Sequence, residues 1–124
     1  MRYLLVSVFV LIATCSNAQQ NINIEDAPKH VNDSVVVCSK IYGGKFLEQT
    51  KGSPTFLDVG AAYPNAPLTL VIWGEVRKQF KQAPELLYNK DVCIYGVIKM
   101  YKGKPEIVIK NEYQILLASR KDVQ

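Results

Sequence analysis

The chain has 124 residues, of which 48% are hydrophobic and 21% are charged, and its formal net charge is +4. This length favours a single folded domain, and the charge is far too low for a histone-like protein. A mildly basic chain permits contact with nucleic acid or with an anionic envelope surface, and it proves neither.

The first eighteen residues are expected to be an export signal rather than part of the fold. Met1-Arg2 supplies a short positive start, Leu4–Ala13 is an almost unbroken apolar stretch, and residues 16–18 are the small residues that a signal peptidase reads. The apolar stretch is too short to anchor the chain permanently in a bilayer. Cleavage before Gln19 would leave 106 of the 124 residues, with 14 basic and 11 acidic side chains.

Cys15 raises an alternative, because residues 11–15 (LIATC) approximate the motif at which lipoproteins are cleaved and lipidated. Thr14 is a poor residue directly before a lipidated cysteine. Export without lipidation, to the periplasm or out of the cell, is therefore preferred.

Residues 19–33 are expected to form a polar N-terminal tail and one short helix. Residues 19–23 are polar, and apolar residues at helical spacing follow between 24 and 31, where Pro28 limits the helix to about one or two turns. His30 is the only histidine in the chain. A lone histidine beside a short helix is more often a surface or capping residue than a metal ligand.

Alternating and β-branched apolar runs from residue 34 onward predict five strands, and one segment before the fourth strand changes to a helical period. Glycines at positions 43 and 44 are expected to bend the first strand, and two prolines make residues 61–67 a loop. Residues 113–118 form a final strand-like run, and residues 119–124 are a polar tail. In chain order we predict strands at 34–42 (continued to 48 beyond the glycines), 54–60 and 68–73, a helix interrupted by Pro84 at 76–88, and strands at 92–101 and 105–110 joined by a tight turn at 102–104.

This order of three strands, one helix and two strands is that of the OB-fold, a five-stranded, partly open β-barrel with its helix between strands three and four. The long first strand with its glycines fits, because this strand must bend to belong to both halves of the barrel. The main alternative is a small β-sandwich, which would need more strands and no internal helix. We therefore predict an all-β OB-fold domain over residues 34–118.

Three stretches carry a resemblance to a known family: PTFLDVG, YPNAPLTLVIWGEVRKQF and KDVCIYGVIKMYKGKPEIVI. They resemble the exported bacterial OB-fold family of nucleic-acid-binding type, whose domains occur alone or as accessory modules of secreted nucleases. The resemblance covers residues 27–115. It implies binding of single-stranded DNA or RNA and an association with an exported nuclease. OB-folds also bind oligosaccharides and proteins, so the fold alone does not choose among these ligands.

Cys38 and Cys93 are expected to form a disulfide bond. Strand alternation places Cys38 on the same face as Lys40, and Cys93 on the same face as Lys99, so both cysteines point outward. In an OB-fold the first and fourth strands are neighbours, and an outward pair of cysteines is readily oxidised in an exported protein. Two free thiols are the alternative, because cross-strand disulfides are often strained. Two cysteines supply only half of a structural zinc site.

The expected ligand-binding face lies on the outside of strands two and three, between the loops that join strands one to two and four to five. Alternation leaves Phe56 and Asp58 pointing outward, and an exposed aromatic ring can stack on any base. A partly buried position at the end of the barrel is the alternative for Phe56. Trp73, at the end of the third strand, is expected to pack in the core under the helix.

Cations and tyrosines surround this face, which is the combination that phosphate contact and base stacking require. The alternative is an ordinary solvated surface. Lys51, Lys78 and Tyr63 belong to the wider set of basic and aromatic residues near the face. The candidate nucleic-acid-binding residues are Tyr42, Lys45, Phe56, Arg77, Tyr101, Lys102 and Lys104.

The sequence holds no catalytic arrangement. A single histidine and two cysteines that are expected to be bridged leave no nucleophile–base pair, and Asp58 and Glu106 do not form a metal-binding acid cluster. A phosphate-cradling glycine loop is also absent from the sequence. We predict a non-catalytic binding module without metal or cofactor, with single-stranded nucleic acid as its ligand. The alternative is an envelope module that binds a protein or a glycan on the same face.

Overall fold

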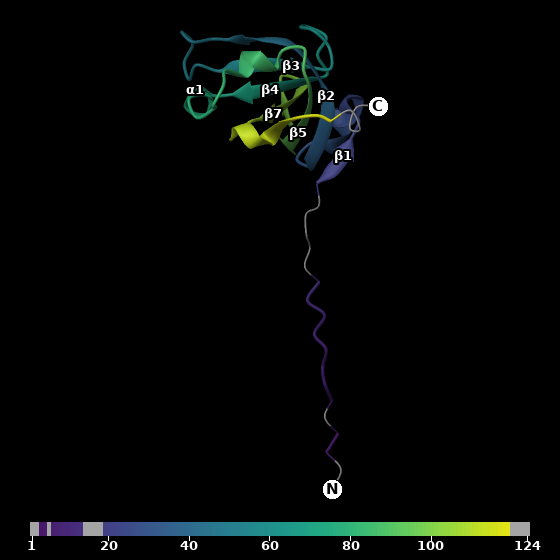
Figure 1. Ribbon diagram of the computed structural model, residues 1–124. Helices are drawn as coiled ribbons and strands as arrows, with labels where there is room; N and C mark the ends of the chain where they lie inside the picture. Colours follow the sequence, from purple (N-terminus) through teal and green to yellow (C-terminus); the bar gives the residue numbers. More distant parts are fainter. Residues whose placement is uncertain (1–2, 5, 14–18, 120–124) are drawn as a thin grey trace.

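The computed structural model describes residues 3–4, 6–13 and 19–119, and the chain is mostly β-structure (Figure 1). Residues 19–119 contain eight strands, one short α-helix and three 3-10 helices. The strands are β1 (Gln20–Ile22), β2 (Ser34–Phe46), β3 (Thr55–Val59), β4 (Leu68–Ile72), β5 (Asp91–Val97), β6 (Lys99–Tyr101), β7 (Lys104–Val108) and β8 (Ile115–Leu117), and the helices are η1 (Ile24–His30), α1 (Gly74–Arg77), η2 (Pro84–Leu87) and η3 (Glu112–Gln114).

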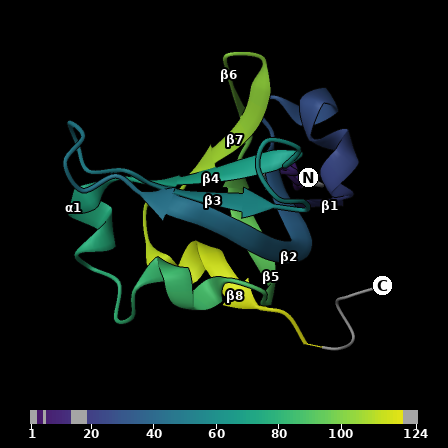
Figure 2. The same cartoon turned by 90° about the horizontal axis from the view of Figure 1, so that it is seen from above.

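The strands form one sheet in the order β6-β7-β4-β3-β2-β5-β8, and β1 pairs with β2. The β4–β7 and β1–β2 pairs are parallel, and the other pairs are antiparallel. Only Ile98 separates β5 from β6. β5 and β6 are therefore consecutive in the chain, although five positions separate them in the order of the sheet. Figure 2 shows β2, β3 and β4 side by side, with the β6–β7 hairpin beyond β4.

A bulge in β2 lets this one strand serve two neighbours. Residues Ser34–Lys40 pair with β5, and residues Ile41–Phe46 pair with β3. The register with β3 shifts between Ile41 and Gly43, so Tyr42 is the extra residue of the bulge. A Cβ atom at Gly44 would collide with the backbone oxygen of Phe56, so this position requires glycine. The predicted bend of the first strand is confirmed.

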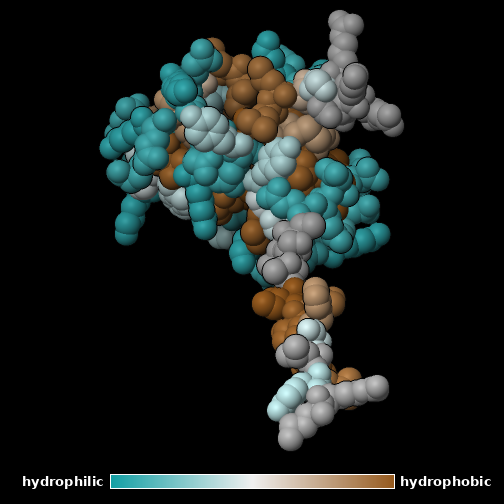
Figure 3. All heavy atoms as spheres, turned by 60° about the horizontal axis from the view of Figure 1, so that its bottom comes forward, coloured by the Kyte–Doolittle hydropathy of each residue, from teal (hydrophilic) through white to brown (hydrophobic). Residues whose placement is uncertain are grey.

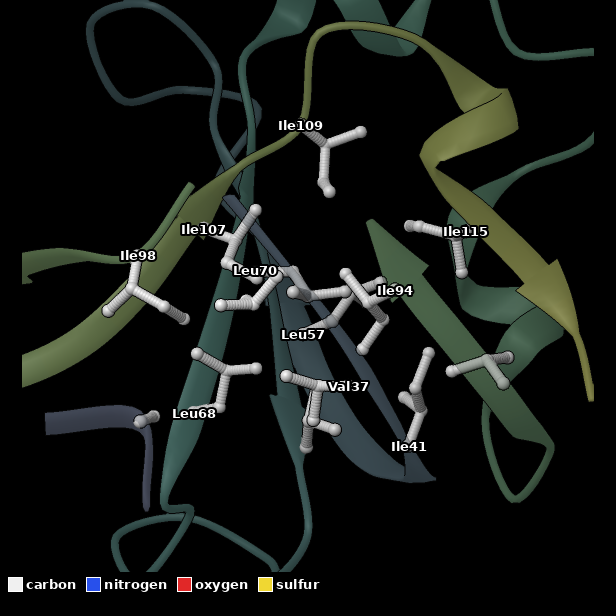
Figure 4. Packing of buried hydrophobic residues seen from close by; sticks show 14 of the residues in the cluster. Val37, Ile41, Leu57, Leu68, Leu70, Ile94, Ile98, Ile107, Ile109 and Ile115 are labelled. Carbon is white, nitrogen blue, oxygen red and sulfur yellow. The ribbon is translucent and has the colours of Figure 1, made fainter. Parts of the chain in front are cut away.

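The core consists of the inward-facing residues of the strands, and Figure 4 shows their side chains pointing toward one another. Every second residue of a strand faces the same side, and the large aliphatic residues on the inward side are fully buried. Burying each large aliphatic side chain contributes about 1.5–3 kcal/mol relative to leaving it exposed. The largest of these side chains are Ile41, Leu57, Leu68, Leu70, Ile72, Ile94, Ile98, Ile107 and Ile109.

Short helical segments cover the open parts of this core. Ala27 of η1 is fully buried within it, and Phe80, Leu87 and Tyr88 from the segment around η2 pack against it as partly buried residues. The predicted short helix at the N-terminal side is confirmed as the 3-10 helix η1. The core therefore includes residues that precede the expected start of the domain at residue 34.

The prediction of a polar tail at residues 19–23 is wrong in part, because Gln20–Ile22 form the strand β1. Their backbone pairs in parallel with Val35–Val37, and of the three residues only Ile22 packs against the core. Pairing of this kind uses backbone groups, so polar side chains that remain in solvent do not prevent it. Hydropathy patterning could not reveal such a strand.

The predicted helix at 76–88 is also corrected. The structure has a four-residue α1 and, after a non-helical stretch, the four-residue η2, which begins at Pro84. Proline removes a backbone donor and clashes with the preceding turn, so the apolar spacing on its two sides could not be joined into one helix. The helical period nevertheless reflected real packing, because Val76 and Phe80 contact the core.

The prediction of five strands is too low, because residues 19–119 contain eight. The predicted fourth strand is divided at Ile98, which forms a bridge with Val31, and residues 113–118 supply part of η3 and then β8. Asn111 caps η3 by accepting a hydrogen bond from the Tyr113 backbone at 3.0 Å. β8 then pairs with β5, and together with β1 it extends the sheet beyond the predicted strands.

The predicted disulfide between Cys38 and Cys93 is confirmed, with an S–S distance of 2.06 Å. The two residues stand directly opposite each other in the β2–β5 ladder. The alternative of two free thiols is therefore wrong. The disulfide joins the strand that carries the bulge to the strand that follows the helical segment.

The described residues between 3 and 13 contain no helix or strand and expose their apolar side chains (Figures 1 and 3). Among the described residues, no helix is long and apolar enough to cross a membrane. The expected cleavage site at residues 16–18, the alternative lipidation site at Cys15 and residues 120–124 of the expected tail lie outside the described residues.

Candidate ligand-binding site

A pocket of about 310 Å³ opens on the outer face of β2, β3 and β4. Strand alternation builds its floor, because Phe56 and Asp58 are the outward residues of β3 and Thr69 is an outward residue of β4. The lining residues are Gly44, Lys45, Phe56, Asp58, Tyr63, Pro64, Ala66, Thr69 and Lys104.

Cross-strand pairing fixes the spacing of these groups. Lys45 of β2 stands opposite Phe56 of β3, so a cation and an aromatic ring are direct neighbours. Asp58 stands opposite Thr69, which in turn stands opposite Glu106 of β7. Directly opposite residues point to the same face, so both rows present their side chains to the outside of the sheet.

The loop between β3 and β4 forms a wall of the pocket through Tyr63, Pro64 and Ala66. Two lysines attach this loop to the sheet. The Lys104 ammonium donates a hydrogen bond to the Pro64 carbonyl oxygen at 3.3 Å, and the Lys45 Nζ lies 5.5 Å from the centre of the Tyr63 ring. The two cations therefore sit on different sides of the pocket, one on β2 and one on β7.

Asp58 is the acidic group of the pocket, and within residues 19–119 its carboxylate has neither a hydrogen bond to another residue nor an ion pair, so it is open to solvent. Burial raises the pKa of Asp58, and the charges of Lys45 and Lys104 partly offset this effect. Glu106, two strands away and outside the pocket lining, also has its pKa raised by burial. The pocket thus offers an unused hydrogen-bond acceptor between two cations.

The β6–β7 hairpin continues the face beyond the pocket. Its two-residue turn has φ of 49° at Lys102 and 77° at Gly103, which is the left-handed pattern of a tight hairpin turn. Tyr101 stands opposite Lys104 and is 59% exposed, and the Lys102 Nζ lies 5.5 Å from the centre of the Tyr101 ring. The tip of the hairpin therefore presents one aromatic ring and two lysines, Lys102 and Lys104.

Arg77 does not join this group. Its guanidinium donates two hydrogen bonds to the Glu85 carboxylate, at 2.6 and 3.0 Å, and one to the Thr55 hydroxyl at 2.9 Å. It also lies 3.7 Å from the centre of the Phe46 ring. The hydrogen bond from Arg77 lowers the pKa of Glu85. The arrangement connects α1, η2 and the ends of β2 and β3, and it uses three of the five N–H donors of the guanidinium.

Other sequence candidates also lie outside the pocket lining. Tyr42, the bulge residue, is 48% exposed, and Lys78 makes an ion pair with Glu75 at 3.5 Å. Trp73 is not in the core as expected but 44% exposed, because it lies between β4 and α1, where its ring packs against Gly52.

His30 has an acidic partner rather than a cluster of metal ligands around it. It pairs with Asp33, with 3.1 Å between the Nδ1 and carboxylate atoms. Within the described residues, no three or more histidine, cysteine or acidic side chains gather in a group that could hold a metal ion.

A second pocket of about 390 Å³ lies between the segment from Phe80 to Lys90 and the C-terminal part of the domain. It shares no lining residue with the first pocket and includes Lys81, Lys90, Leu86 and Leu117. No sequence pattern predicts this second pocket, because its walls come from segments that are distant in the chain.

Two features of the first pocket were missed from the sequence. Asp58 is not among the ligand-binding residues predicted from the sequence. The polar Thr69 in an otherwise apolar strand is the signal that could have identified it, because Thr69 stands opposite Asp58 and the two form a polar row across the sheet. The wall formed by Pro64 and Ala66 depends on how the loop folds back, and no local pattern encodes that path.

Comparison with known proteins adds little to these observations. No family model matches the chain, and no curated protein matches it. One solved structure with a similar arrangement is that of a candidate aspartyl-tRNA synthetase from Leishmania major Friedlin, at 12% identity and a TM-score of 0.49. The similarity covers 89% of this chain but only 23% of that protein.

Proposed function

We propose that this chain is an exported, non-catalytic OB-fold module that binds single-stranded nucleic acid. The proposal places the ligand on the outer face of β2, β3 and β4 and on the β6–β7 hairpin. DNA and RNA are equally compatible with the chemistry of this face, because stacking and phosphate contact do not depend on the sugar.

The strand pairing supports the OB-fold part of the proposal. The long bent strand β2 pairs with β3 and β5, β3 pairs with β4, and β4 pairs in parallel with β7. The helical segments α1 and η2 lie between β4 and β5, as the helix does in that fold. In this interpretation β5 and β6 together are the fourth strand, and β1 and β8 are additions.

The single observation that carries the binding proposal is the pocket that has Phe56 in its lining and Lys45 and Lys104 on its two sides. An aromatic face can stack on a base, and flanking lysines can contact the phosphates on either side of that base. Tyr63, which is 72% exposed, and Tyr101 offer further rings at the edges of the same face.

Export is supported by two observations of different kinds. The N-terminal segment exposes apolar side chains that do not contribute to the core, and the domain contains a disulfide. Structural disulfides persist in oxidising compartments such as the periplasm and the extracellular space. A role beside an exported nuclease would follow naturally, because such an enzyme gains from a module that holds its substrate.

Fluorescence anisotropy with single-stranded oligonucleotides over a range of salt concentrations tests the binding proposal. The affinity should fall steeply with salt, because each lysine–phosphate contact contributes about 0.7 to the slope of log K against log salt for single strands. The double variant Lys45→Ala/Lys104→Ala should therefore reduce the magnitude of this slope by about 1.4.

The matched control removes the same number of charges elsewhere. Lys81→Ala/Lys90→Ala changes two lysines of the second pocket and should leave the slope close to that of the wild type. Equal effects of the two double variants would contradict the proposed site. Absence of binding even at low salt would refute nucleic-acid binding and favour the protein- or glycan-binding alternative on this face.

A further inference from the structure

We propose that the pocket on β2, β3 and β4 accepts one base that carries an exocyclic amino group, and that Asp58 selects it by accepting a hydrogen bond from that group. The inference rests on the proposed nucleic-acid binding and adds a specificity to it. The preferred bases are cytosine, adenine and guanine, and the rejected bases are thymine and uracil.

The size of the pocket supports a single base. Its volume of about 310 Å³ lies at the lower end of the range for ligand pockets, which is about 300–1,000 Å³. This volume can hold one base, and an extended strand of several nucleotides must continue outside the pocket. The exposed rings of Tyr63 and Tyr101 lie at the rim and on the hairpin, where neighbouring bases of the strand could stack.

The distribution of charge decides which part of a nucleotide enters. Asp58 lines the pocket from β3, at its floor, whereas Lys45 and Lys104 line it from β2 and β7. A carboxylate repels a phosphate, so phosphates are directed to the two lysines and away from Asp58. The neutral base is the part of the ligand that can occupy the space beside the carboxylate.

The hydrogen-bonding capacity of Asp58 then distinguishes one base from another. An ionised carboxylate accepts hydrogen bonds and donates none, and within residues 19–119 this one has no protein donor. The amino groups of cytosine, adenine and guanine are donors, whereas thymine and uracil carry carbonyl oxygens in place of an amino group, on either side of their single N3–H donor. When thymine or uracil displaces water from Asp58, at least one of their carbonyl oxygens faces the carboxylate and repels it, which penalises these two bases.

Phe56 orients the base for this contact. Phe56 and Asp58 are two residues apart on β3, so their side chains leave the same face of the strand about 7 Å from each other. A base whose flat face rests on the Phe56 ring can therefore direct its edge toward the carboxylate. Thr69, opposite Asp58, contributes a hydroxyl that can donate or accept a second hydrogen bond.

The test compares ten-nucleotide homopolymers of deoxycytidine and deoxyuridine, which differ at the position of the amino group. The wild type should bind oligo-dC about tenfold more tightly than oligo-dU, within the discrimination expected of side-chain contacts to base edges. Asp58→Asn keeps the shape of the side chain but adds a donor, so it should bring the dC/dU affinity ratio close to 1. Thermal unfolding of the variant checks that it remains folded.

Glu106→Gln is the matched control, because it neutralises an acid of the same face that does not line the pocket. It should preserve the dC/dU ratio while raising both affinities to a similar small extent. A wild-type ratio near 1 with salt-dependent binding would overturn the selectivity and leave the proposed function intact. An equal loss of the ratio in both acid variants would also overturn it, and absence of binding to either oligonucleotide would refute the proposed function itself.

Discussion

Reduction of the Cys38–Cys93 disulfide should remove a large part of the stability of this domain. The two cysteines are separated by 55 residues in the sequence. In the chain-entropy model, closing a loop of this size restricts the unfolded chain by about 4 kcal/mol. Domains of this size are stable by about 5–15 kcal/mol in total, so the disulfide accounts for a substantial share.

The assay is urea unfolding of the oxidised protein and of the same protein held reduced by a phosphine, followed by circular dichroism. The two samples share every side chain, so the difference reports the bond and not a change in packing. We expect a loss of about 4 kcal/mol, equivalent to a decrease in Tm of about 15–30 °C for a domain of about 100 residues. A loss below about 1 kcal/mol would refute the reasoning, because the unfolded chain would then gain almost no freedom from reduction.

Three further predictions concern stability. Gly44→Ala should destabilise the domain by about 3 kcal/mol or more in urea unfolding, because its Cβ would collide with the Phe56 backbone; a loss below about 1 kcal/mol would show that the bulge can relax. Arg77→Ala should lower the free energy of unfolding by about 2–3 kcal/mol without weakening oligonucleotide binding, because the hydrogen bonds of Arg77 to Glu85 and Thr55 stabilise the fold. Weaker binding without a loss of stability would show instead that Arg77 contacts the ligand. Because the Arg77 hydrogen bond lowers the pKa of Glu85 below its ordinary value of 4.5, the folded state binds fewer protons there than the unfolded state. The stability that the Glu85 carboxylate contributes is complete above pH 4.5 and is lost as the pH falls through its lowered pKa. The wild type should therefore lose more stability than Glu85→Gln between about pH 6 and about pH 3. Parallel profiles of unfolding free energy against pH would contradict this prediction.

The sequence predicts the core well, because burial imposes a period of two on every long strand. Positions such as Val37, Leu57 and Ile94 follow from alternation alone, and the same argument placed Cys38 and Cys93 on one face. The register that brings the two cysteines directly opposite each other is a property of the whole ladder. The pairing of the two cysteines could be predicted only after the OB-fold had been assumed, because that fold makes their two strands neighbours.

Features that depend on backbone pairing or on chain direction were not predictable in this way. β1 carries polar side chains, and its pairing with β2 has no hydropathy signal. The helical period around Pro84 reflected contact with the core but not a continuous helix. Both failures have one cause, because side-chain pattern reports which residues are buried and not which backbone groups are paired.

The candidate site shows the same division. Lys45, Phe56 and Lys104 were selected by residue type and strand position, and the structure brings them to one pocket. Arg77 was selected by the same criteria, and its partners Glu85 and Thr55 are 8 and 22 residues away in the chain. Charge alone could not distinguish a cation that lines a pocket from one that is paired with an acid elsewhere, and only the three-dimensional arrangement does.

The most direct test of the account is a backbone-amide NMR titration of the protein with a single-stranded oligonucleotide. We predict that chemical-shift changes concentrate on β3, on Lys45 and on the β6–β7 hairpin, with the largest changes around Phe56 and Asp58. Changes confined to the second pocket around Leu86 and Leu117, or no changes at a low salt concentration, would contradict the central claim.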